Sequence, residues 1–553
     1  MTDVEVRWNV EATMRDGTVL RADVYTPEGD GPFPVLVMRT PYDKNVTFGH
    51  DFLTTARAGY IAVIQDARGS FASDGEWMPW KHERADGYDT VEWAATLPKS
   101  NGRVGMLGMS YNGSTQWSAA VERPPHLAAI APTMTWSDPE DGLLFRGGAV
   151  EHGVNAYWGA AQAVPRYFRT GVEPDVAMAR TMQTIDYFET IADRGYWELP
   201  AGRVSVLVEN DMPDLGVARA LADPATTNES RVSNRYDDVD VPALVTAGWY
   251  DVFLQGALDN FDGLRSRGKT ARLVVGPWSH TTLPAALGSR VGEVNFGMGS
   301  LLPGGKSVQN LQHEWYEHWL QGAPATEAHE SGVLIFVMGI NQWRAESEWP
   351  LARALDTPLY LDKKSALSWE PNTATGDEST YTYDPADPVI TRGGNFVLSS
   401  DYEAGVFDQR DTEARDDVLV FTTPPLEQDL EITGRVRATL FAETDGPSTD
   451  WVVRLCEVDS KGVSRNLVDG ITRVHNEPNR VDEVNVDLWS TSIVVREGHK
   501  LRVHVTSSNF PRWDRNLNAG DSEAEKLTGR VAKQRILHDS QHPSRIILPV
   551  IPN

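Results

Sequence analysis

Three residues of this chain have the types and the chain order that nucleophilic acyl transfer requires. The first is Ser110, in the segment GMSYNG (residues 108–113), a pattern typical of a sharp turn between a buried strand and a helix. Such a turn exposes the serine Oγ at a helix N-terminus, where backbone N–H groups favour a developing oxyanion. The motif departs from Gly-x-Ser-x-Gly, because Asn112 occupies the second glycine position. The segment alone is equally compatible with an ordinary turn serine.

An acid and a histidine follow Ser110 along the chain. Residues 241–250 (VPALVTAGWY) and 271–279 (ARLVVGPWS) have the pattern of buried strands; Asp251 follows the first and His280 the second. Ligand sites of open α/β sheets lie beyond the carboxyl ends of strands, and serine, acid, histidine is the chain order of α/β-hydrolase triads. We therefore predict that Ser110 is a nucleophile, His280 its base and Asp251 the acid that orients the imidazole.

The elements that must position these residues begin as alternating strands and helices. Buried runs at residues 35–38 and 61–65 are followed by a helical pattern over 82–97, whose acidic residues are expected on the outer face. This alternation continues to about residue 135 and predicts a mostly parallel sheet.

Two changes of pattern divide the rest of the chain. Helical periodicity dominates residues 138–234, which predicts a helical cap inserted above the active site. After residue 349, short alternating strands separated by turn residues predict a β-sandwich of the jelly-roll type over 349–553. We expect the α/β-hydrolase catalytic domain to consist of residues 1–137 and 235–348.

Composition restricts the classes of function. The net charge of −27 argues against nucleic acids and anionic membranes as partners, and no apolar run approaches the roughly 18 residues of a transmembrane helix. Cys456 is the single cysteine, and the N-terminus lacks a signal-peptide pattern, so we expect a cytoplasmic protein without disulfides. The histidines of HEWYEH, His313 and His318, are five apart instead of four, the wrong spacing for a zinc helix. We expect no metal and no cofactor, and the oligomeric state stays open, with a homodimer among the choices.

Longer motifs resemble one family along essentially the whole chain. The segments PYDK (41–44), DARGS (66–70), GMSY (108–111), GWYDVF (248–253) and VVGPWSH (274–280) are similar to those of the bacterial cocaine esterase family. This branch of serine hydrolases also contains X-Pro dipeptidyl peptidases and α-amino acid ester hydrolases. The segments FVMGI (336–340) and SSNFP (507–511) extend the resemblance into the C-terminal region.

The resemblance implies further site residues. It implies an α/β-hydrolase core with a helical cap and a C-terminal jelly roll, and an oxyanion hole made by the Tyr111 N–H and the Tyr42 hydroxyl. A fixed phenol is a suitable neutral donor to a forming alkoxide. The positions that the resemblance assigns to the acyl pocket are Leu143, Trp158, Phe253, Val397 and Leu398.

Substrate class is the least determined property. The α-amino acid ester hydrolases place two carboxylates just after the catalytic acid, whereas this chain has Phe253 and Leu254 there, so a neutral apolar or aromatic acyl ester is the expected substrate. The same triad could instead cleave an amide, as in an amidase, an acylase or an X-Pro dipeptidyl peptidase. A non-catalytic ligand-binding protein is the third reading.

Overall fold

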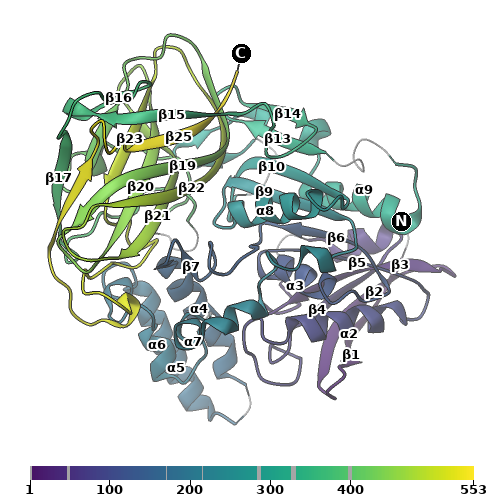
Figure 1. Cartoon of the computed structure of the whole chain (residues 1–553). Coiled ribbons are helices and arrows are strands. Elements are labelled where there is room, and N and C mark those ends of the chain that lie inside the picture. Colours follow the sequence, from purple (N-terminus) through teal and green to yellow (C-terminus); the bar gives the residue numbers. More distant parts are fainter. Residues whose placement is uncertain are drawn as a thin grey trace.

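Among the described residues of the computed structural model, ten strands form one sheet in the N-terminal part of the chain (Figure 1). The structure describes residues 3–46, 50–169, 171–214, 216–282, 288–325, 332–396 and 401–552. Seven neighbouring strands, from β4 to β13, are parallel, and antiparallel strands flank them at both edges. The order across the sheet is β1 (Val4–Thr13), β2 (Val19–Pro27), β4 (Ile61–Asp66), β3 (Phe33–Thr40), β5 (Ser100–Met109), β6 (Leu127–Thr133), β9 (Ala243–Tyr250), β10 (Ala271–Ser279), β13 (Val333–Val337) and β14 (Gln342–Glu346).

Helices cover both faces of this sheet, which explains the continuous apolar runs of its strands. Successive residues of β3 point to opposite sides: Val35 and Val37 belong to one core cluster, and Leu36 and Met38 to the other. On the first side lie α2 (Glu83–Ala95), α3 (Tyr111–Ala120) and α8 (Leu254–Arg265). On the second side lie α1 (Phe52–Arg57) and α9 (Val308–Gln321).

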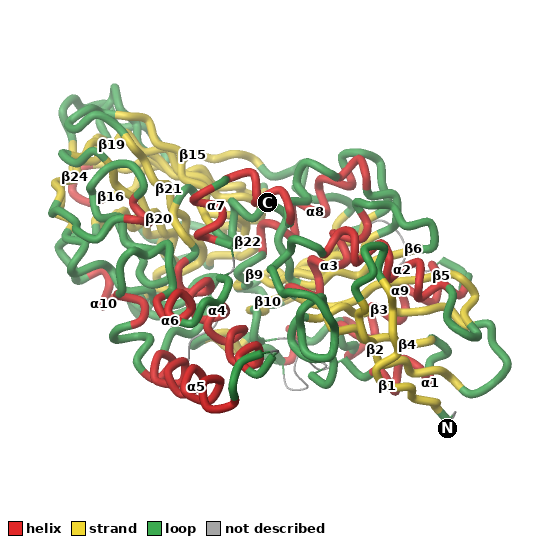
Figure 2. Tube along the Cα trace, turned by 90° about the horizontal axis from the view of Figure 1, so that it is seen from below, coloured by secondary structure: helices red, strands yellow, loops and turns green. Residues whose placement is uncertain are grey.

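The chain between β6 and β9 is mainly helical. Its elements are β7 (Phe145–Arg146), β8 (Ala149–Val150), α4 (His152–Tyr167), α5 (Pro174–Glu189), α6 (Ser205–Glu209) and α7 (Val217–Ala222), with 3-10 turns at Gly195–Trp197, Pro224–Glu229 and Tyr236–Asp238. Figures 1 and 2 show α4, α5 and α6 as a separate layer beside the strand-rich region. This arrangement is the helical insertion that the periodicity predicts.

Strands dominate the C-terminal region. Eleven of them, within the residues described, hydrogen-bond into a sheet that curls into layers (Figure 1). They are β15 (Leu355–Asp362), β16 (Ala366–Ser368), β17 (Glu378–Tyr383), β18 (Leu419–Thr422), β19 (Leu430–Thr444), β20 (Ser448–Val458), β21 (Ser464–His475), β22 (Asp482–Val495), β23 (Lys500–Thr506), β24 (Ala532–Leu537) and β25 (Arg545–Ile551). The predicted fold class, an α/β core with a strand-rich C-terminal domain, is confirmed.

Two further findings concern the histidines of α9 and the helices that could span a membrane. His313 bonds to the Thr55 hydroxyl at 3.0 Å, and His318 to the Ala323 carbonyl at 2.7 Å, so the two rings serve different partners. Trp315 and Tyr316 of the same helix are buried in the core between α9 and the sheet. Among the described helices, none has the length and apolar character needed to cross a bilayer.

Candidate active site

Ser110 occupies a strained corner between β5 and α3. Its φ of 62° and ψ of −124° lie where side chains other than glycine are rarely found. A Cβ at Gly108 would lie 2.6 Å from the Asn112 Cβ, and one at Gly113 would lie 3.0 Å from the Thr133 carbonyl oxygen. Both positions therefore need glycine for close packing. Gly113, which faces β6, lies one position later than the second glycine of the Gly-x-Ser-x-Gly motif. This geometry is that of a nucleophile elbow.

Asp251 and His280 meet at the same edge of the sheet as Ser110, because β5, β9 and β10 are parallel and each precedes one of the three residues. His280 Nδ1 and Asp251 Oδ2 are 2.6 Å apart, and the Asp251 side chain is fully buried. The other carboxylate oxygen, Oδ1, accepts a 2.8 Å hydrogen bond from the Phe253 N–H. Both oxygens are thus engaged, which fixes the direction in which the carboxylate faces the imidazole.

Tyr42 lies just after β3 and faces Ser110. Its hydroxyl accepts a 3.0 Å hydrogen bond from Trp158 Nε1. Burial raises the pKa of Tyr42 to about 12, although the nearby side chains of Trp158 and Ser110 partly oppose the shift. The phenol therefore keeps its proton at neutral pH and can act as a donor.

Aromatic rings form a continuous wall from Tyr42 to His280. Trp158 stacks on Tyr111 with ring centroids 6.1 Å apart, and Phe253 packs edge-on against His280 at 5.3 Å. Leu143, Trp158 and Phe253 belong to one apolar cluster with Tyr42 and Tyr111. The structure therefore brings together every predicted pocket residue that it describes. Val397 and Leu398 lie outside the described residues.

Matches to known proteins cover both parts of the chain. Residues 16–282 match the X-Pro dipeptidyl-peptidase (S15) family, and residues 327–547 match the X-Pro dipeptidyl-peptidase C-terminal non-catalytic domain. A cocaine esterase from Rhodococcus sp. is 36% identical, over 98% of this chain and 98% of its own. The chain belongs to the cocaine esterase family. It is therefore an enzyme, a serine-type hydrolase, and the reading as a non-catalytic binding protein is set aside.

Two solved structures are similar to this cocaine esterase family member over nearly its whole chain. An α-amino acid ester hydrolase has a TM-score of 0.81 and 25% identity, with 99% of this chain and 97% of that chain covered. An aminopeptidase from a marine sediment Thaumarchaeota archaeon has a TM-score of 0.79 and 25% identity, with coverage of 100% and 97%.

Sequence reasoning missed part of the aromatic wall of this esterase-family site. Trp80 stacks on Tyr111 with centroids 5.9 Å apart, and Trp136 lies 5.6 Å from Trp80 and 5.1 Å from Phe253. The two tryptophans of the segment WMPW (77–80) were a usable signal, because large aromatic side chains contribute strongly to cores and binding surfaces. The site is more aromatic than the predicted positions alone indicate.

The predicted outer face of α2 is wrong for its first turn. Glu83 and Asp86 are buried rather than solvated, because Arg39 and Arg68 face them from the sheet side. Glu83 pairs with Arg39 at 2.6 Å and accepts a 2.9 Å hydrogen bond from the Tyr111 hydroxyl. A hydrophobic pattern could not reveal this, because burial here depends on opposite charges supplied by distant segments.

We expect Glu83→Ala to lower the stability of the hydrolase core. The substitution removes the 2.6 Å partner of the fully buried Arg39 guanidinium and leaves it only Asp86, at 3.9 Å; breaking a buried pair costs about 3–5 kcal/mol. Asp89→Ala is the matched control on α2, because its Arg15 partner is largely exposed and such pairs contribute about 0–1 kcal/mol. Thermal unfolding followed by calorimetry measures both. Equal shifts in the two variants would contradict the assignment.

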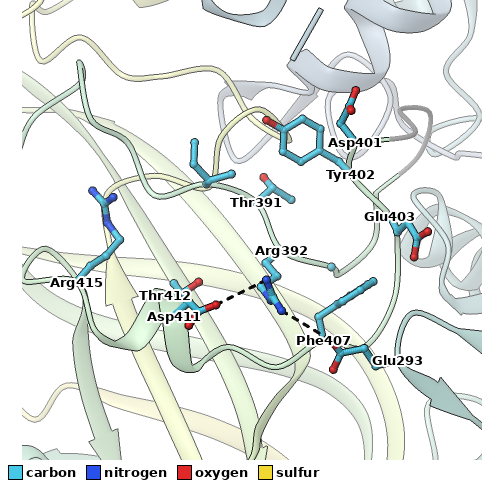
Figure 3. Close-up of a pocket in the computed structure, with 12 residues that line it drawn as sticks. Glu293, Thr391, Arg392, Asp401, Tyr402, Glu403, Phe407, Asp411, Thr412 and Arg415 are labelled. Carbon is cyan, nitrogen blue, oxygen red and sulfur yellow. Dashed lines mark ion pairs between the residues drawn. The ribbon is translucent and has the colours of Figure 1, made fainter. Parts of the chain in front are cut away.

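A separate set of residues lines a cavity of about 550 Å³ (Figure 3). Its lining combines Arg392 with the aromatic rings of Tyr402 and Phe407, and none of the predicted site residues that the structure describes borders it. Arg392 is 3.7 Å from Glu293 and 3.9 Å from Asp411, so its charge is compensated within the cavity. Three residues after Arg392, the side chain of Asn395 reaches the loop that carries Asp251.

Proposed function

We propose that this protein is a serine carboxylesterase that hydrolyses esters with apolar or aromatic acyl groups. The observation that carries the proposal is the 2.6 Å hydrogen bond between Asp251 and His280, at the sheet edge where Ser110 forms a strained elbow. Membership of the cocaine esterase family supports the same chemistry.

The proposed mechanism has two acyl-transfer steps. Ser110 Oγ attacks the ester carbonyl carbon while His280 takes its proton, and Asp251 stabilises the imidazolium. The tetrahedral intermediate collapses when His280 gives this proton to the leaving alcohol, and an acyl-serine remains. Water then attacks the acyl-serine with His280 again as the base, and the acid is released with Ser110 restored.

The oxyanion of both intermediates would be held by Tyr42 and by the backbone of Tyr111. Tyr111 is the first residue of α3, where backbone N–H groups have no acceptor within the helix. The Ser110 side chain lies close enough to the Tyr42 hydroxyl to lower its pKa, which supports a place for this hydroxyl near the oxygen that becomes negative.

The preference for neutral acyl groups rests on the absence of an available carboxylate among the described residues of the apolar cluster. The three acids of the insertion that could hold a substrate ammonium are engaged elsewhere. Glu140 accepts from Arg231 at 2.7 Å, Asp141 from Trp489 at 3.3 Å and Glu151 from Trp513 at 3.0 Å. Phe253 and Leu254, which follow the acid, are both buried apolar side chains.

We therefore expect phenylpropionyl p-nitrophenyl ester to be a better substrate than the phenylalanyl ester. A charged α-ammonium in this cluster would be buried without a partner, which costs several kcal/mol. A differential transition-state energy of about 3 kcal/mol already gives roughly a 10²-fold difference in kcat/KM. The comparison is made at a pH where the amine is protonated. Equal values, or a preference for the amino ester, would overturn the proposed acyl specificity.

The alternative function keeps the same three residues and cleaves an amide bond. The match to the X-Pro dipeptidyl-peptidase family and the similarity to an aminopeptidase favour it. Parallel assays of p-nitrophenyl acyl esters and an Ala-Pro-anilide separate the two functions. Faster turnover of the anilide would replace the esterase proposal by the peptidase.

A further inference from the structure

A side chain from the C-terminal half of the protein reaches the loop that carries the proposed catalytic acid. Asn395 Nδ2 donates to the carbonyl oxygen of Asp251 at 2.8 Å and to that of Trp249 at 3.1 Å. Asn395 is 4% exposed and lies 144 residues after Asp251 in the chain. One amide group thus binds the backbone on both sides of Tyr250.

These two carbonyls lie where the regular ladder around β9 is broken. Pairing of β9 with β6 ends at Thr246, and the register between β9 and β10 breaks between Gly276 and Ser279 before one further pair forms at Tyr250. Buried backbone carbonyls need partners, and where the ladder is irregular a side chain can supply them. Asn395 does so at the last turn before the Asp251 carboxylate.

The backbone on which Asn395 sits is itself held firmly. Gly394 exchanges two backbone hydrogen bonds with Gly405, at 2.7 and 2.9 Å. With a φ of +84°, it packs so closely that a Cβ there would lie 3.2 Å from Asp469 Oδ2 and 3.3 Å from Arg512 Nη1. Asp469 and Arg512 are buried and paired at 2.5 Å. The strand-rich domain therefore packs closely behind Asn395.

We propose that Asn395 is a positioning residue for the reaction. It fixes the turn from Trp249 to Asp251 and, through that turn, the direction of the Asp251 carboxylate toward His280. The inference rests on the proposed function, because it assigns Asn395 an effect only through Asp251. It also gives the strand-rich domain a direct part in the geometry of the active site.

The first test compares Asn395→Ala and Asn395→Asp with a matched control. Both variants remove the amide donor, and the aspartate also directs an acceptor at two carbonyl oxygens. We expect kcat for an acyl ester to fall roughly 10- to 100-fold with KM little changed, because displacement of a catalytic group by about 1 Å costs up to 10²-fold. The rate of Ser110 labelling by a fluorophosphonate should fall in parallel.

The control is Asn518→Ala. Asn518 is also a fully buried asparagine of the strand-rich domain, and its amide donates to the Arg530 carbonyl at 2.8 Å. We expect it to lower the melting temperature without lowering kcat. If Asn395→Ala lost only thermal stability, as the control does, its role would be structural and the proposal would be overturned.

A double-mutant cycle with Asp251→Ala tests whether Asn395 acts through Asp251. If Asn395 acts through Asp251, adding Asn395→Ala to Asp251→Ala should cause no further loss of turnover, since residues that act as a unit are non-additive. Additive losses would overturn the positioning role. Activity retained by Asp251→Ala alone would instead overturn the proposed triad, so the two failures are distinguishable.

Discussion

Ser110→Ala and His280→Ala are each expected to lower ester turnover by about 10⁴- to 10⁶-fold while the fold is retained. Nucleophile and base act as a unit, so removal of either one abolishes most of the acceleration. His280 lies at 2.6 Å from Asp251, and Ser110 is held at the strained elbow, so each is placed for the role proposed for it. Turnover of a p-nitrophenyl ester measures the loss, and circular dichroism reports the fold.

Two matched variants control for unspecific damage. Ser114→Ala removes a buried hydroxyl on the same helix, which donates to the Tyr111 carbonyl at 2.9 Å. His126→Ala removes a largely exposed histidine that pairs with Glu92. Both should keep turnover close to that of the wild type. More than a tenth of wild-type activity in Ser110→Ala or His280→Ala would remove that residue from the proposed triad.

Tyr42→Phe should lower kcat by about 10²- to 10³-fold, the usual cost of one oxyanion donor. KM should change much less, because the donor acts on charge that exists only in the transition state. Since burial raises the pKa of Tyr42 to about 12, the phenol should remain a donor at a pH near 10, where an ordinary tyrosine loses its proton. Steady-state kinetics with a neutral acyl ester measures both parameters.

Tyr60→Phe is the control for this tyrosine. Tyr60 is fully buried in the core on the other side of the sheet, and its hydroxyl has no hydrogen-bond partner among the described residues, so the variant should retain full activity. If Tyr42→Phe raised KM and left kcat unchanged, Tyr42 would be a substrate-binding residue instead of an oxyanion donor.

Local pattern was sufficient to predict the elements that carry the site. The strands before Ser110, Asp251 and His280 each contain a short apolar run. Such runs are expected of parallel strands that helices cover on both faces. Because carboxyl ends of neighbouring parallel strands lie at one edge, the order of the three residues also predicted that they would lie close together. Asp251 and His280 do so. The helical insertion and the strand-rich C-terminal domain followed from changes in periodicity.

Tertiary structure alone decided which distant side chains complete the site. The bond from Trp158 to Tyr42 joins the insertion to the loop after β3, and Asn395 joins the C-terminal half to the turn after β9. The burial of Glu83 depends on Arg39, 44 residues earlier, and reverses the solvated face expected for α2. Periodicity reports whether a residue faces the core, because that depends on the spacing of apolar neighbours along the chain. It carries no information on which polar partner from another segment will be there, since that depends on how the finished elements pack.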